Sequence, residues 1–172
     1  MFRKWLQVFG IALLLLGLSG CNQSIEEQIT NGFQRIEMVF ADEPEKYTDT
    51  VGDIQLYLPT TFTIDDRSDQ YNMLVSKGKQ SYILFINDRE KQDSKLYYEL
   101  LKEENSKEII AEQTYENDGA FSFTAVSKTE DAQAFELIVS SGGVKMTTIS
   151  PMKDVEDNLL EMTKIVHSVK IK

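Results

Sequence analysis

The side chains that could do covalent or acid–base chemistry are few in this sequence. There is one cysteine, Cys21, and one histidine, His167, so neither a disulfide nor a multi-histidine metal site can form within the chain. A histidine-paired hydroxyl nucleophile would have to use His167, which follows Val166 at the edge of an apolar helical stripe. We therefore interpret His167 as a helix-edge residue without a catalytic role.

One loop places three carboxylates within five residues and is the strongest candidate for a cation site. Its ligands would be Asp65, Asp66 and Asp69, because calcium prefers carboxylate oxygens. The ligand spacing and the glycine of an EF-hand are missing, and Arg67 would oppose a cation. We favour a solvated β-turn and keep the three residues only as weak metal candidates.

Among 28 acidic residues, a pair at the spacing of a glycoside hydrolase will arise by chance, so composition does not support an enzyme.

The residues before Cys21 have the pattern of a secretory signal. Arg3 and Lys4 lead into an uncharged run over residues 5–20, which ends in small residues. This run is shorter than the roughly 20 residues that span a bilayer core, so a membrane-spanning helix is the less favoured alternative.

The end of this run, Leu18-Ser19-Gly20-Cys21, resembles the bacterial lipobox. The resemblance implies cleavage before Cys21 and a diacylglycerol on its sulfur, with an acyl chain such as palmitate on the new amino terminus as a further option. The mature chain would then be anchored at the extracytoplasmic face of the cell membrane, because several acyl chains hold a protein stably where one binds only marginally. Ordinary secretion with a cysteine there by chance is the alternative.

The chain is acidic, with a net charge of −10. Removal of the signal takes away Arg3 and Lys4 and no acid, which brings the charge to −12. Phosphate backbones repel such a domain, so we do not expect a nucleic-acid partner. The charge favours basic partners or cations, although an acidic surface also serves solubility.

The chain divides into three parts: a signal over residues 1–20, a tether over 21–50 and a single domain over 51–172. Apolar residues at spacings of four and three predict an amphipathic helix in the tether: Ile25, Ile29, Phe33, Ile36 and Phe40. Residues 41–50, which are rich in charge and contain Pro44, predict a linker.

The domain shows the alternation typical of strands at residues 54–58, 73–76, 82–86, 109–115, 121–127, 134–140 and 144–149. The run 82–86 is apolar on both faces and predicts a central strand covered on both sides. One helix should follow a cap at Asp93 or Ser94, and another should start near Asp154, after Pro151. This order predicts an α+β fold, an antiparallel sheet covered by helices.

The motif Ile54-Gln55-Leu56-Tyr57-Leu58-Pro59 with Phe62, the hairpin into residues 82–87 and the two helices resemble the PsbP-like superfamily over residues 50–172. The resemblance implies an α-β-α sandwich that serves as an accessory or binding subunit, and it carries over no functional residues. A cystatin-like or nuclear-transport-factor-like sheet is the alternative, disfavoured by the helix between strands.

These observations predict a lipid-anchored, non-enzymatic interaction or accessory module for an envelope protein, without a cofactor other than the lipid on Cys21. A small-ligand or cation-binding surface receptor is the alternative, and a cell-wall enzyme is less favoured.

Overall fold

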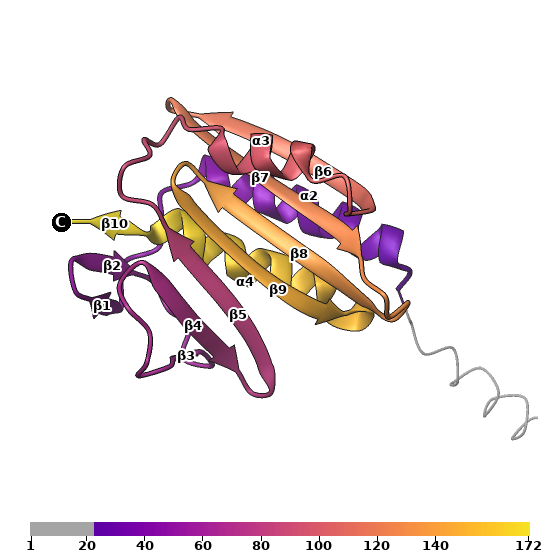
Figure 1. Cartoon of the computed structure of the whole chain (residues 1–172), viewed down its shortest axis with the longest axis horizontal. Coiled ribbons are helices and arrows are strands. Elements are labelled where there is room, and N and C mark those ends of the chain that lie inside the picture. Colours follow the sequence, from indigo (N-terminus) through magenta and orange to yellow (C-terminus); the bar gives the residue numbers. More distant parts are fainter. Residues whose placement is uncertain (1–22) are drawn as a thin grey trace, which may run out of the picture.

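Residues 23–172 are described by a computed structural model, in which a seven-stranded antiparallel sheet carries helices on both faces (Figure 1). The strand order is β3-β4-β5-β9-β8-β7-β6. The bounds are β3 Thr63–Ile64, β4 Asn72–Lys77, β5 Gln80–Ile86, β6 Ile109–Asn117, β7 Ala120–Lys128, β8 Ala134–Ser141 and β9 Val144–Pro151. A second sheet, β1-β2-β10, joins Asp49–Val51, Ile54–Leu56 and Lys170–Ile171. The helices are α2 Ile25–Ala41, α3 Leu96–Glu103 and α4 Val155–Ser168, and a 3-10 turn, Met152–Asp154, precedes α4.

The predicted antiparallel α+β fold is confirmed, and the predicted hairpin into residues 82–87 is formed by β4 and β5. Two further hairpins join β6 to β7 and β8 to β9. Their turns are Asp118-Gly119 and Gly142-Gly143. Both Asp118 and Gly119 have positive φ, as a tight hairpin turn requires.

Helices α2 and α4 lie together behind the large sheet and build the main core with it (Figure 1). Ser24 caps α2, because its Oγ accepts a hydrogen bond from the Glu27 amide at 3.2 Å. Ile36 of α2 and Leu159 of α4 are fully buried in this core. The helix predicted over residues 25–40 is therefore present, and it packs on residues 51–172, which the sequence left open.

The other face of the sheet is only partly covered, because α3 has eight residues and lies over one side of it. Tyr97 and Leu101 of α3 pack on Phe121 and Phe123 of β7 in a second, smaller core. The prediction that residues 82–86 are covered on both faces is wrong: Ile83 is 56% exposed. The apolar residues of this run could not show how far helix α3 extends over the sheet.

Two local predictions also need correction. Lys95, not Asp93 or Ser94, occupies the N-cap position of α3, although Ser94 Oγ accepts a hydrogen bond from the Leu96 amide at 3.2 Å. The expected linker over residues 41–50 ends in strand β1, and the predicted strand at 54–58 joins β1 and β10 rather than the large sheet.

Between residues 23 and 172, no helix combines the length and apolar character needed to cross a membrane.

A series of buried hydrogen bonds connects the large sheet to α4. Asn158 of α4 accepts a hydrogen bond from the Tyr82 hydroxyl at 2.8 Å and donates one to Ser150 Oγ, also at 2.8 Å. Ser150 Oγ in turn donates to the Pro151 carbonyl. Tyr82, Ser150 and Asn158 are all buried, so each polar atom depends on these partners.

Three buried tyrosines should make the protein sensitive to alkali. Burial raises the pKa of Tyr82, Tyr97 and Tyr115, to about 12 for Tyr97. In the unfolded chain tyrosine ionises near pH 10, so the free energy of unfolding should fall as the pH rises from about 10 towards 12. Below pH 10 all three tyrosines are neutral in both the folded and the unfolded state, so they do not lower the free energy of unfolding there. Denaturant unfolding at a series of pH values measures the slope.

Tyr97→Phe isolates one of these contributions. The Tyr97 hydroxyl is buried and has no hydrogen-bond partner among the described residues, so its removal should not destabilise the protein at pH 7. The fall in stability above pH 10 should be shallower in this variant. Tyr47→Phe, at a position that is 56% exposed, is the control and should leave the slope unchanged. Equal slopes in the wild type and in Tyr97→Phe would contradict the assignment.

Candidate functional site

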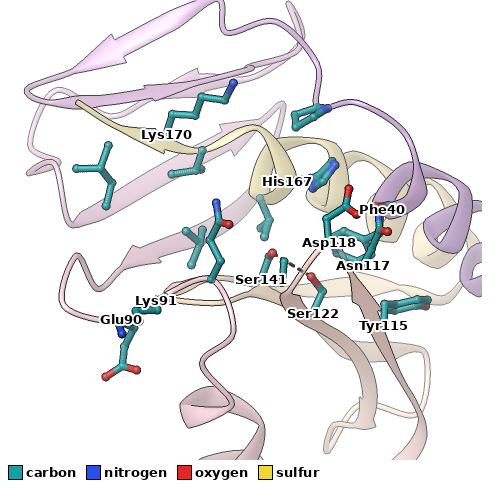
Figure 2. Close-up of a pocket in the computed structure, with 18 of the residues that line it drawn as sticks. Phe40, Glu90, Lys91, Tyr115, Asn117, Asp118, Ser122, Ser141, His167 and Lys170 are labelled. Carbon is teal, nitrogen blue, oxygen red and sulfur yellow. Dashed lines mark hydrogen bonds between the residues drawn. The ribbon is translucent and has the colours of Figure 1, made fainter.

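A hollow lies where α2 and α4 end, and we call it the pole cleft. It has a volume of about 650 Å³. Figure 2 shows its walls, which come from the ends of both helices, the turns after β6 and β8, the loop after β5, and β10. The floor is apolar in part, with Phe40, Tyr115, Val144 and Val166, while charged side chains stand around the opening.

The cleft lies at the far end of the helices from the start of the described chain. Arg35 of α2 pairs with Glu156 in the first turn of α4 at 2.8 Å, whereas Asp42, just after α2, contacts His167 in the last turn of α4. The two helices therefore run in the same direction. The 17 residues of α2 span about 25 Å between Ser24 and the cleft.

His167 joins the two helix ends at this cleft. Its Nε2 lies 3.1 Å from the Asp42 carbonyl oxygen, and because a carbonyl only accepts, Nε2 carries the proton. The ring meets Phe40 edge to face with centroids 5.4 Å apart. His167 is a helix-edge residue, as predicted, but sequence reasoning missed its place at the cleft. The position of His167 within its helix could not show that the segment after α2, which contains Asp42, lies against it.

The two serines of the cleft bond each other rather than the histidine. Ser122 Oγ donates to Ser141 Oγ at 2.9 Å, across the pair of strands β7 and β8 (Figure 2). Asn117 Nδ2 donates to the Phe40 carbonyl at 2.9 Å and satisfies an acceptor at the end of α2. These contacts hold the cleft walls together and prepare no nucleophile.

The loop of residues 87–92 forms a closely packed wall of the cleft. The Asn87 amide donates to the Gly143 carbonyl at 2.8 Å, and the Phe121 amide donates to the Gln92 carbonyl at 2.9 Å. A Cβ on Gly143 would lie only 2.3 Å from the Asn87 carbonyl oxygen. The loop and the turn after β8 can approach this closely only because residue 143 is glycine.

The electrostatics of the cleft favour positive charge. Two helix C-termini meet here, and the last turn of a helix carries partial negative charge. Acids outnumber lysines among the lining residues, which include Asp42, Glu43, Glu90 and Asp118 against Lys91 and Lys170. A lysine or arginine side chain of a bound segment would find complementary groups here, so the arrangement suits recognition of a basic segment.

The aspartate candidates Asp65, Asp66 and Asp69 lie elsewhere, beside β3 and β4, and the carboxylates of Asp65 and Asp69 are engaged in hydrogen bonds. Arg67 donates two hydrogen bonds to Asp65 at 2.9 Å and holds the pKa of that carboxyl well below its usual range. Asp69 accepts from the amides of Tyr71 and Asn72, which lower its pKa. Over residues 23–172, no three His, Cys, Asp or Glu side chains come together in a way that could hold a metal ion.

Comparison with solved structures gives a likeness of fold. The structure resembles that of cyanobacterial PsbP. The match is to the solution structure of CyanoP from Synechocystis sp. PCC 6803, with a TM-score of 0.44, 13% identity, and coverage of 74% of this chain and 92% of that one. A crystal structure from Bacteroides thetaiotaomicron VPI-5482, at 1.50 Å, matches with a TM-score of 0.37 and 9% identity. That match covers 76% of this chain and 49% of the other.

Both likenesses concern the arrangement of helices and strands and assign no function to this chain. Protein-family models give no match, and none of the curated proteins compared with the chain is similar to it in sequence. Leu18, Ser19, Gly20 and Cys21, the residues of the lipobox resemblance, lie outside the described residues.

Proposed function

We propose that this chain is a lipoprotein held by Cys21 at the extracytoplasmic face of the cell membrane, where it serves as a non-enzymatic interaction module for an envelope protein. The observation that carries the proposal is the position of the pole cleft. Cys21 is separated from Ser24 by two residues, and α2 begins directly after Ser24. An anchor at Cys21 would therefore join the chain close to one end of the helix pair, and the cleft opens at the other end.

The chemistry of the cleft supports binding rather than catalysis. His167, the single imidazole of the chain, is engaged by the Asp42 carbonyl and Phe40, and the two cleft serines bond each other. The surrounding acids and helix ends favour a basic segment, so the partner we propose is an envelope protein that presents lysine or arginine. A small-ligand receptor is the second candidate, because about 650 Å³ lies within the usual range of ligand pockets.

Cys21→Ala should release the protein from the membrane into the extracytoplasmic fraction or the medium, because no acyl chain can then be attached. Cell fractionation followed by detection of the chain measures this. Asn22→Ala, one residue further on, is the matched control and should stay in the membrane. If the Cys21 variant remains in the membrane fraction, the anchor proposal is wrong.

Photo-crosslinking in intact cells tests the partner. A photoreactive amino acid at Asp118, which lines the cleft, should capture an envelope protein. The same group at Asp157, whose side chain is 76% exposed in the first turn of α4, probes the opposite end and should capture much less. Capture from both positions alike would contradict a role for the cleft. Recovery of the chain alone would favour the small-ligand receptor.

A further inference from the structure

Two strands, one from each sheet, leave an edge unpaired beside the same hollow. β1 is the last strand of the small sheet and β3 is the last strand of the large one, and each pairs with a single neighbour. A hollow of about 490 Å³ is lined by both strands, by Leu58 and Phe62, and by the loop after β3. We call this hollow the edge slot. In Figure 1 the small sheet stands beside the β3 end of the large sheet.

The edge slot meets the edges of these strands rather than one of their faces. All three residues of β1, Asp49–Val51, and both residues of β3, Thr63–Ile64, line it. Successive side chains of a strand point to opposite faces, so a hollow on one face would touch only alternate residues. The edge slot therefore lies between two unpaired strand edges.

Each of the two strands directs the peptide groups of one residue away from its own sheet. Val51 and Ile54 close the two-residue turn between β1 and β2 as a hydrogen-bonded pair, so the N–H and C=O of Thr50 point away from β2. The same alternation, counted from the turn between β4 and β5, points the N–H and C=O of Ile64 away from β4. Within residues 23–172, neither Thr50 nor Ile64 bonds to the backbone of a loop. The edge slot therefore offers donors and acceptors in the arrangement that a strand requires.

The size of the edge slot matches one short strand. A three-residue strand is about 10 Å long and takes up about 4.8 Å across a sheet and about 10 Å between layers, which makes roughly 480 Å³. A sheet strand of a second copy could not enter, because it brings a neighbouring strand with it and both sides of the slot are occupied. A helix would leave the peptide groups of Thr50 and Ile64 unpaired, because it bonds its own. The fitting occupant is an extended segment that belongs to no sheet.

The apolar lining of the edge slot indicates which side chains such a segment carries. Leu58 and Phe62 are buried. Val51 and Ile64, which also line the slot, are half-buried, so apolar residues of a bound segment would complete their burial. β-branched residues suit this position because they pack well on neighbouring strands.

The charges of the edge slot favour lysine or arginine beside these apolar residues. The charged side chains that line it are all acids: Asp49, Asp65 and Asp66. Arg67 is engaged by Asp65, and Lys77, which follows β3 across the sheet, is paired with Glu161. Lys46 and Lys79, the neighbouring bases in sequence, do not line the slot. The first and last of the three acids make no ion pair with a described residue, so a basic segment would complement them.

We propose that the edge slot binds an extended segment of a partner protein, in which about three apolar, β-branched residues are flanked by lysine or arginine. The segment pairs with β1 on one side and with β3 on the other, covers Leu58 and Phe62, and joins the two sheets into one. The edge slot and the pole cleft share no lining residue, so this proposal stands whether or not the function proposed above is correct.

A peptide titration of the full chain tests the proposal. The chain is used as cells produce it, in phosphatidylcholine nanodiscs where it carries lipid and free in buffer where it does not. The probe is a fluorescent peptide with valine, threonine and valine between two lysines, and fluorescence anisotropy measures its binding. The same peptide methylated on the threonine nitrogen keeps every side chain and loses one backbone donor. It should bind at least about tenfold more weakly.

Thr50→Pro makes the matching change in the protein, because it removes the N–H that β1 offers, and should weaken binding at least about tenfold. Proline is tolerated in an edge strand where its nitrogen faces solvent, so the fold should be kept, which circular dichroism checks. Thr50→Ala retains the N–H and should bind like the wild type. Thr114→Pro, at an outward-pointing residue of β6, the other edge of the large sheet, is the matched control and should also bind like the wild type.

Four results would overturn the proposal. Equal binding by the wild type and Thr50→Pro would show that the peptide does not pair with β1. Equal binding of the methylated and unmethylated peptides, a comparison that needs no variant of the protein, would show that side chains alone hold the peptide. Loss of binding in Thr114→Pro but not in Thr50→Pro would place the peptide on the edge of β6. Absence of saturable binding at millimolar peptide would show that the edge slot does not take such a segment.

Discussion

Asn158→Ala should lower the free energy of unfolding by about 3 kcal/mol, because it breaks the buried hydrogen-bond chain between α4 and the sheet. The Tyr82 hydroxyl loses its acceptor and Ser150 Oγ loses a donor, both in the core where water cannot replace them. A small cavity adds to the loss. Denaturant unfolding of the variant and the wild type at neutral pH measures the difference.

A double-mutant cycle separates the hydrogen bond from the cavity. Tyr82→Phe removes the hydroxyl that Asn158 accepts from, so in this background Asn158→Ala should cost less than it does in the wild type. Asn105→Ala, at an exposed position between α3 and β6, is the surface control and should change stability by less than about 0.5 kcal/mol. If the effects of Asn158→Ala and Tyr82→Phe are simply additive, the two side chains are not coupled as the structure indicates.

Gly143→Ala should cost about 2 to 3 kcal/mol through overpacking at the wall of the pole cleft. The added methyl would lie 2.3 Å from the Asn87 carbonyl oxygen and 2.9 Å from Glu90 Cβ, so the loop of residues 87–92 must move away. Thermal or denaturant unfolding measures the cost. Movement of the loop should also increase hydrogen exchange at the Asn87 amide, which bonds to the Gly143 carbonyl.

Gly78→Ala is the informative comparison for this variant. Gly78 lies in the turn between β4 and β5 with φ of +61°, and an added Cβ there would have no atom within 4 Å. Its replacement should therefore cost only the backbone penalty of a left-handed conformation, about 1 kcal/mol. If Gly143→Ala costs no more than Gly78→Ala, the loop is not packed against the turn as described.

The parts of the fold that sequence predicted well are those fixed by local patterns. Asn117-Asp118-Gly119 and Ser141-Gly142-Gly143 mark tight turns by composition, and the strands that flank them alternate, so the four strands from β6 to β9 could be recognised as two hairpins. Helix α4 was predictable because its buried positions, such as Leu159 and Met162, recur at helical spacing.

The parts that sequence did not predict depend on contacts between distant segments. Strand β10 has two residues and exists because it pairs with β2, more than 100 residues earlier. The pole cleft brings Phe40, Asn117, Ser141 and His167 together from four elements, and no local spacing relates them. Ile83 looked buried because its neighbours are apolar, whereas its exposure depends on where the short helix α3 ends.

The arrangement of the chain ends has a consequence for export. Helix α4, which fills the main core, and β10, which completes the small sheet, follow the other described elements in sequence, and they pack on α2 and pair with β2 from the beginning of the domain. The core therefore cannot close until nearly the whole chain is available. A chain exported by the signal proposed above would therefore stay open, and able to pass through a translocation channel, until residues 155–171 had been synthesised.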